Sequence, residues 1–124
     1  MIKSFPTSEV EKASKLIVYD TSRGFSRFIK SKFEEQFEVI VISSPQEIRK
    51  YKTDDLGVLL FIVNDGVDAI LFSNIFYNTK HVFLGIAAKH LEDRFLNYKN
   101  VKQIDLELPK KELFLYLNQH LQTA

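Results

Sequence analysis

The feature that most constrains the fold is a run of six apolar residues, Val58–Val63, in which no position is polar. A strand with one wet face alternates apolar and polar residues, so a strand that is apolar throughout is expected to be covered on both faces. Such strands occur in parallel sheets, where crossover helices lie on both sides of the sheet. The run therefore predicts a central strand of an α/β domain.

The rest of the chain repeats the pattern of a strand followed by a helix. Apolar and β-branched runs predict strands over residues 16–19, 37–42, 58–63, 82–87 and, with strict alternation, 101–108. The spacing of apolar residues predicts helices over 25–36, 45–52, 68–77, 91–97 and 109–120. The connections are too long for hairpins, so the alternation predicts a parallel sheet with right-handed crossovers and helices on both faces.

Composition excludes several classes of protein. The 124 residues suit one domain, which we expect at residues 15–122 after an N-terminal arm of residues 1–14. The absence of cysteine excludes disulfides, thiolate metal sites and cysteine nucleophiles, and it is compatible with a cytoplasmic location. A formal net charge of +1 argues against a general nucleic-acid binder. No apolar run approaches the roughly 20 residues that span a bilayer, so no membrane role is expected.

Candidate binding residues lie in the loops that follow the strands, because ligands of such sheets bind beyond the carboxyl ends of the strands. These loops are expected at residues 20–24, 64–68, 87–90 and 108–110. Asp20 suits a metal ligand or, at a strand-to-helix turn, a cap or turn residue. Lys110 and Lys111, in the first turn of the last predicted helix, could hold an anion or face solvent.

The chain resembles the receiver domain of two-component response regulators over residues 15–122. The resemblance rests on the order and intervals of four segments, Leu16–Asp20, Glu34–Val39, Val58–Asp68 and Leu106–Pro109. It implies a flavodoxin-like (CheY-like) three-layer α/β/α sandwich with five parallel strands in the order 2-1-3-4-5. In the family, two acidic residues follow the first strand, and an aspartate of the third strand accepts a phosphoryl group. A Ser or Thr ends the fourth strand, and a Lys-Pro pair ends the fifth.

Carried over position by position, most of this chemistry is missing here. The acidic pair falls on Tyr19 and Asp20, and the phosphoacceptor falls on Phe61, with an alternative register that places it at Asp65. The resemblance therefore implies a degenerate phosphorylation pocket formed by Tyr19, Asp20, Phe61, Ile86, Leu108 and Pro109.

The positions of this pocket at the ends of the fourth and fifth strands also carry apolar residues where the family has polar ones. The Ser or Thr position falls near Ile86, and the lysine falls on Leu108, while the proline persists as Pro109. Mg²⁺ needs oxygen ligands, and a transferred phosphoryl group needs positive charge beside it. The resemblance therefore implies a pseudo-receiver that is not an enzyme and holds no metal or cofactor.

The leading interpretation is a phosphorylation-independent signalling domain that binds a protein partner or forms a homodimer. In the family, dimerisation commonly uses the last two helices and the strand between them. Here that surface is expected to include Leu91, Phe95, Tyr98, Asp105, Glu112, Tyr116 and Gln119.

A second interpretation is a small flavodoxin-like protein that binds a phosphate-bearing cofactor such as FMN. The hydroxyl-rich loop 21–26 opens a helix, so its backbone amides and hydroxyls could cradle a phosphate. The loop is only weakly similar to that of flavodoxins, because Phe25 stands where a small polar residue is usual. Phe95 and Tyr98 are the aromatic candidates to enclose a flavin ring.

Overall fold

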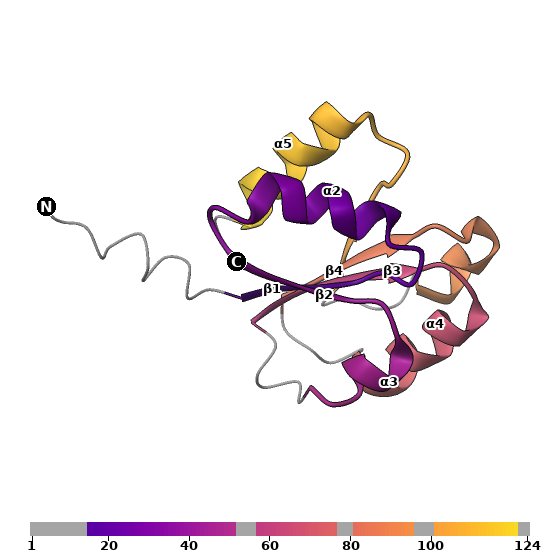
Figure 1. Ribbon diagram of the computed structural model, residues 1–124. Helices are drawn as coiled ribbons and strands as arrows, with labels where there is room; N and C mark the ends of the chain where they lie inside the picture. The colour runs from indigo at the N-terminus through magenta and orange to yellow at the C-terminus, as the bar shows by residue number, and fades with distance from the viewer. Residues whose placement is uncertain (1–14, 52–56, 77–80, 96–100, 122–124) are drawn as a thin grey trace, which may run out of the picture.

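Five parallel strands form the centre of the fold (Figure 1). The computed structural model describes residues 15–51, 57–76, 81–95 and 101–121. The strands are β1 (Lys15–Tyr19), β2 (Glu38–Ile42), β3 (Val58–Val63), β4 (Val82–Ile86) and β5 (Val101–Ile104). Their order in the sheet is β2-β1-β3-β4-β5, and all four neighbouring pairs are parallel. The predicted strand order is confirmed.

Helices cover both faces of the sheet, as predicted (Figure 1). One face carries α2 (Gly24–Phe33) and α5 (Lys110–Leu121), and the other carries α3 (Pro45–Ile48) and α4 (Gly66–Leu71). A short π-helix, η2 (Phe72–Phe76), continues α4, and a 3-10 helix, η3 (Lys89–Phe95), follows β4. The protein is therefore a three-layer α/β/α sandwich.

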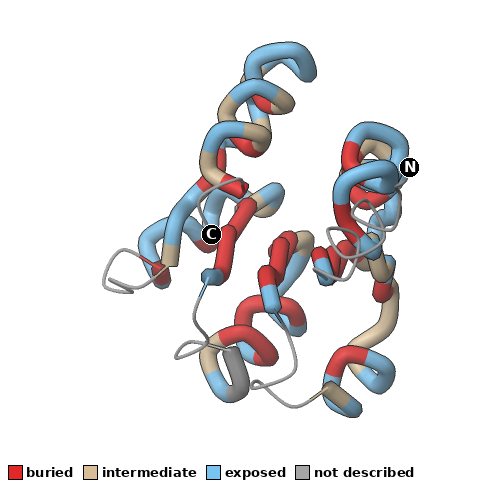
Figure 2. Tube along the Cα trace, turned by 90° about the vertical axis from the view of Figure 1, so that its left-hand side faces the viewer, coloured by how far each residue is buried: buried red, intermediate tan, exposed pale blue. Residues whose placement is uncertain are grey.

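Each face of the sheet has its own hydrophobic core. Ile29 of α2 and Leu117 of α5 pack with alternate strand residues on one face, and Phe72 and Phe95 pack on the other. All six residues of β3 are buried, as the uninterrupted apolar run predicts. Figure 2 shows the buried strands at the centre, with the exposed sides of the helices turned outward.

Five predicted boundaries were wrong by two residues or more, and local hydrogen bonds explain two of them. α2 ends at Phe33 and not at residue 36, and η3 starts at Lys89 and not at residue 91. β5 ends at Ile104 and not at residue 108, because Asp105 accepts the backbone N–H of Glu107 at 2.9 Å and forms a turn. α4 starts at Gly66, two residues early, because the Asp65 side chain caps it. α3 ends at Ile48 and not at residue 52. The residues 1–14 expected to form an arm lie outside the described residues.

Candidate functional site

Asp20 closes the turn between β1 and α2. It is the first residue after β1, and its side chain is fully buried. Its Oδ1 accepts the backbone N–H and the hydroxyl of Ser22 at 3.2 and 2.8 Å, and its Oδ2 accepts the backbone N–H of Ser26 at 3.1 Å. Arg23, at the N-cap position of α2, has a left-handed backbone (φ 69°) and makes no side-chain cap. Asp20 therefore caps α2, which agrees with the cap or turn role that the sequence suggested as one of two alternatives.

Asp68 ties the start of α4 to the ends of β1 and β3. It is 1% exposed, and its Oδ1 accepts the hydroxyl of Tyr19 at 2.9 Å. Its Oδ2 accepts the backbone N–H of Asn64 at 2.9 Å and the Thr21 hydroxyl at 3.4 Å. Its own backbone N–H donates to Asp65 Oδ1 at 3.0 Å, which is the cap of α4.

Asn64 joins the two carboxylates. It directly follows β3, and its side-chain amide donates to Asp20 Oδ1 at 2.9 Å and to Thr21 Oγ1 at 3.3 Å, while its backbone N–H donates to Asp68. Asp20, Thr21, Asn64, Asp68 and Tyr19 therefore form one connected group, here called the rim network. Asn64 lies in the predicted candidate loop 64–68 and is the first polar residue after the apolar run, but the sequence indicated no role for it by itself.

Burial and hydrogen bonding shift the two carboxyl groups in opposite directions. For Asp20, burial alone would raise the pKa, but the hydrogen bonds from Asn64, Ser22 and Ser26 outweigh it and hold the pKa below its usual range. For Asp68, burial outweighs the hydrogen bonds from Asn64 and Tyr19, and its pKa lies above its usual range. The two carboxyl groups are therefore not equivalent, and Asp20 is the more firmly ionised.

Phe61, at the position that the resemblance gives to the phosphoacceptor, is a core residue. It is fully buried two residues before the end of β3, and its ring stacks on that of Tyr19 with centroids 4.5 Å apart. It also contacts Phe72 of η2, with centroids 5.2 Å apart. Phe61 and the ring of Tyr19 thus lie in the core, and the first polar side chain after β3 is that of Asn64.

The other predicted pocket residues do not join the rim network. Ile86 is the last residue of β4 and is half-buried, and Leu108 packs against the core on the α2 and α5 face. Pro109 is exposed just before α5. None of these three donates a side-chain hydrogen bond or carries charge, so they add no polar group to the rim.

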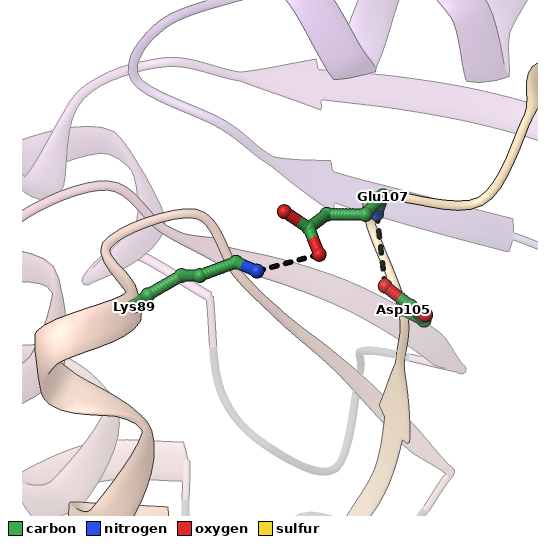
Figure 3. A network of polar contacts seen from close by, with 3 residues as sticks. All are labelled: Lys89, Asp105 and Glu107. Atoms are coloured by element: carbon green, nitrogen blue, oxygen red, sulfur yellow. Dashed lines mark hydrogen bonds and ion pairs between the residues drawn. The ribbon is translucent and has the colours of Figure 1, made fainter.

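An ion pair lies at the carboxyl ends of β4 and β5. Lys89 of η3 pairs with Glu107, whose backbone N–H donates to Asp105 (Figure 3). Both side chains of the pair are more than half exposed. The hydrogen bond that Lys89 donates to Glu107 raises the pKa of Lys89 above its usual range. Lys89 is thus engaged by a carboxylate that is not part of the rim network.

The predicted interface residues are only partly on the surface. Leu91 and Phe95 are 6% and 1% exposed, so they belong to the core and their assignment to an exposed surface was wrong. Asp105, Glu112 and Gln119 are exposed, and Tyr116 is half-buried with its ring stacked on His120. Tyr98 lies outside the described residues.

The donor set of the rim network does not fit a Mg²⁺ ion. Each carboxylate oxygen of Asp20 and Asp68 already accepts at least one hydrogen bond from the chain. Asn64 turns its amide N–H toward Asp20, whereas a metal ligand would offer its oxygen. Within the described parts of the chain, no group of three or more His, Asp or Glu side chains could hold a metal ion.

Comparisons with known proteins match the fold. A response regulator from Colwellia psychrerythraea aligns with a TM-score of 0.66 and 11% identity, covering 90% of this chain and 98% of its own. A CheY-like receiver domain protein from Methanospirillum hungatei JF-1 aligns with a TM-score of 0.63 and 13% identity over 89% of this chain and 94% of its own. A response regulator from Desulfuromonas acetoxidans aligns with a TM-score of 0.63 and 16% identity over 90% of this chain and 99% of its own.

No protein-family model matches the chain, and no curated protein matches its sequence. With identities of 11–16%, the solved structures establish the CheY-like fold, and the chemistry of the rim must be argued from this chain's own residues. Within residues 15–51, 57–76, 81–95 and 101–121, no helix is long and apolar enough to span a membrane.

Proposed function

We propose that this chain is a receiver-like signalling domain that works without phosphorylation, by binding a protein partner or a second copy of itself. It has no catalytic role in this proposal. A cytoplasmic location belongs to the same proposal and is supported by the absence of cysteine.

One observation carries the proposal, and it is the closed state of the rim network. A phosphoacceptor carboxylate must be free to attack, with a metal ion and a cation beside it to balance the developing charge. Asp20 and Asp68 are instead buried and hydrogen-bonded by the chain itself, and the side chain that follows β3 is an amide. To free either carboxyl group for reaction, the chain would have to break several of its hydrogen bonds. That costs free energy, because both groups are buried.

The same turn argues against the alternative of a phosphate-bearing cofactor. The backbone N–H groups of Ser22 and Ser26 and the hydroxyl of Ser22 would have to face the phosphate. All three donate to the carboxylate of Asp20, which therefore occupies the place of the anion. A phosphate would have to displace a buried, ionised side chain.

A small phosphodonor tests the proposal directly. We expect incubation with acetyl phosphate and Mg²⁺ to leave the intact mass of the wild-type chain unchanged. The variant Asp65→Asn controls for the alternative register, because Asp65 is exposed and lies in the loop after β3. A phosphoryl adduct on the wild type that disappears in Asp65→Asn would assign the acceptor to Asp65 and refute phosphorylation independence.

The surface proposed for the partner is the outer face of α5. Glu112 and Gln119 are exposed there, and Leu115 between them is 55% exposed. Large apolar side chains on an otherwise polar helix face are a common feature of protein interfaces. Ile70 of α4, on the opposite side of the sheet, is 57% exposed and provides a matched control.

Sedimentation equilibrium and pull-downs with two variants test this surface. We expect Leu115→Arg to abolish self-association, or the capture of one defined protein, and Ile70→Arg to leave it unchanged. Equal binding by the wild type and Leu115→Arg would exclude this face as the interface. Far-UV circular dichroism would establish that both variants fold, because both replace exposed residues.

A further inference from the structure

A groove between α2 and α5 combines an aromatic floor with cationic walls. Its volume is about 660 Å³, and it lies on the face of the sheet opposite α3 and α4. Its lining residues come from the length of α2 and the start of α5, and they are Gly24, Arg27, Phe28, Ser31, Lys32, Lys110, Lys111 and Phe114.

The floor of the groove is fixed by contacts between the two helices. Phe114 of α5 packs on Phe33 of α2 with ring centroids 5.3 Å apart, and Phe28 and Phe114 are both half-buried. Lys110 Nζ lies 5.8 Å from the centroid of the Phe28 ring. An incoming apolar side chain would therefore meet the half-buried rings of Phe28 and Phe114 beside positively charged side chains.

Charge is segregated across the surface although the whole chain is almost neutral, with a formal net charge of +1. The groove is lined by four cationic side chains and by no carboxylate. Carboxylates gather elsewhere, around a second hollow beyond β4 and β5 that is lined by Glu92, Asp105 and Glu107 together with Lys89. The groove is thus a local site of positive potential that attracts acidic partners.

We propose that this groove docks an acidic amphipathic helix of a partner protein. The apolar side of the helix would lie on Phe28 and Phe114, and its carboxylates would pair with Arg27, Lys32, Lys110 and Lys111. A helix laid in a groove with apolar anchors and complementary charge is a recurrent recognition mode. This inference goes beyond the proposed function and uses a different surface from the Leu115 face of α5.

The arrangement of the rings favours a protein helix over single-stranded nucleic acid. Bases bind such sites by stacking on open aromatic faces. Phe114 is engaged by the Phe33 ring, and Phe28 lies under Lys110. A neighbouring side chain thus lies against each ring and reduces the aromatic face left for a base, whereas leucine side chains can pack against any part of a ring.

A designed peptide provides the probe. It would carry leucine at i, i+3, i+4 and i+7 over about four turns with glutamate elsewhere, and its binding would be followed by fluorescence anisotropy. Arg27→Glu is compared with Lys30→Glu, because both residues are exposed on α2 and undergo the same change of charge, but only Arg27 lines the groove. We expect the Kd to rise about tenfold or more in Arg27→Glu and to change less than about threefold in Lys30→Glu.

Four outcomes would overturn the proposal. Equal weakening by the two variants would indicate diffuse charge attraction, and equal binding of a lysine version of the peptide would exclude recognition of acidic groups. Tighter binding of a single-stranded oligonucleotide, lost in Arg27→Glu, would assign the groove to nucleic acid. Self-association lost in Arg27→Glu would assign it to a second copy. None of these results affects the phosphodonor test of the rim.

Discussion

Replacing Asn64 by alanine tests whether the rim network holds the site closed. The change removes the hydrogen bonds to Asp20 Oδ1 at 2.9 Å and to Thr21 Oγ1 at 3.3 Å, and it leaves the backbone bond to Asp68 in place. A hydrogen bond to a charged group contributes about 1.5–3 kcal/mol to stability. The bond to Thr21 is long and joins neutral groups, so it adds little. We expect the free energy of unfolding to fall by about 2 kcal/mol at neutral pH.

The loss should depend on pH, with a sign set by Asp20. Its pKa is lowered in the folded state, so its ionised form stabilises the protein above the unfolded pKa of about 3.9. This stabilisation is lost as the pH falls through the lower, folded value. Asn64 makes a leading contribution to the lowered pKa. The difference between wild type and Asn64→Ala should therefore shrink below pH about 4.

Urea denaturation followed by far-UV circular dichroism at pH 7 and near pH 3 measures both effects. A loss of about 2 kcal/mol corresponds to a midpoint shift of about 1 M urea for a chain of this size. A double-mutant cycle with Asp20→Asn should give clear coupling, and Asn74→Ala, at an exposed asparagine of η2, serves as the control. The same cost at both pH values, or no coupling to Asp20, would refute the reasoning.

Three further predictions concern stability. The pKa of Asp68 is raised in the folded state, so its protonated carboxyl group stabilises the fold below the unfolded pKa of about 3.9. This stabilisation is lost as the pH rises through the folded pKa, and the urea midpoint of Asp68→Asn should lack that decline. A Cβ added at Gly85 would lie 2.8 Å from Ile62 Cδ1 and 2.9 Å from Leu106 Cδ2, so Gly85→Ala should cost about 1–3 kcal/mol in thermal unfolding. Leu106→Ala in the same chain should recover part of this loss, because it removes one of the two contacts. Lys89→Ala should leave the urea midpoint almost unchanged, because its pair with Glu107 is largely exposed; a clear fall of the midpoint would contradict this.

Much of the fold could be predicted from the sequence because periodicity is a local signal. The runs at β1 and β3 are short and wholly apolar at their centres, and their lengths match the strands to within a residue. The end of β5 could not be predicted in this way, because Leu106 and Leu108 continue the alternation although they lie in a turn. Both still pack on the core, so the hydrophobic pattern continues where the strand does not.

The rim network was the less predictable part, because it depends on distant residues. Tyr19 and Asp68 are 49 positions apart, and Asn64 and Asp20 are 44 apart. Each residue alone suits an ordinary turn, cap or core position. Their joint role follows only from the parallel order of β1 and β3, which brings the ends of both strands together. Composition and spacing carry no information about which donor meets which acceptor.

The closed rim also determines where a signal can enter. In this chain, the starts of α2 and α4 are held to each other by Asp20, Asn64 and Asp68, so neither helix can shift without breaking hydrogen bonds to buried carboxyl groups. The starts of α5 and η3 contribute no residue to the rim network, and the exposed pair of Lys89 and Glu107 joins η3 to the loop before α5. That pair is weak. The rim network contains no residue of α5, so we expect a partner to bind α5 without opening the network, and the matched variants on α5 and α2 would separate those two surfaces.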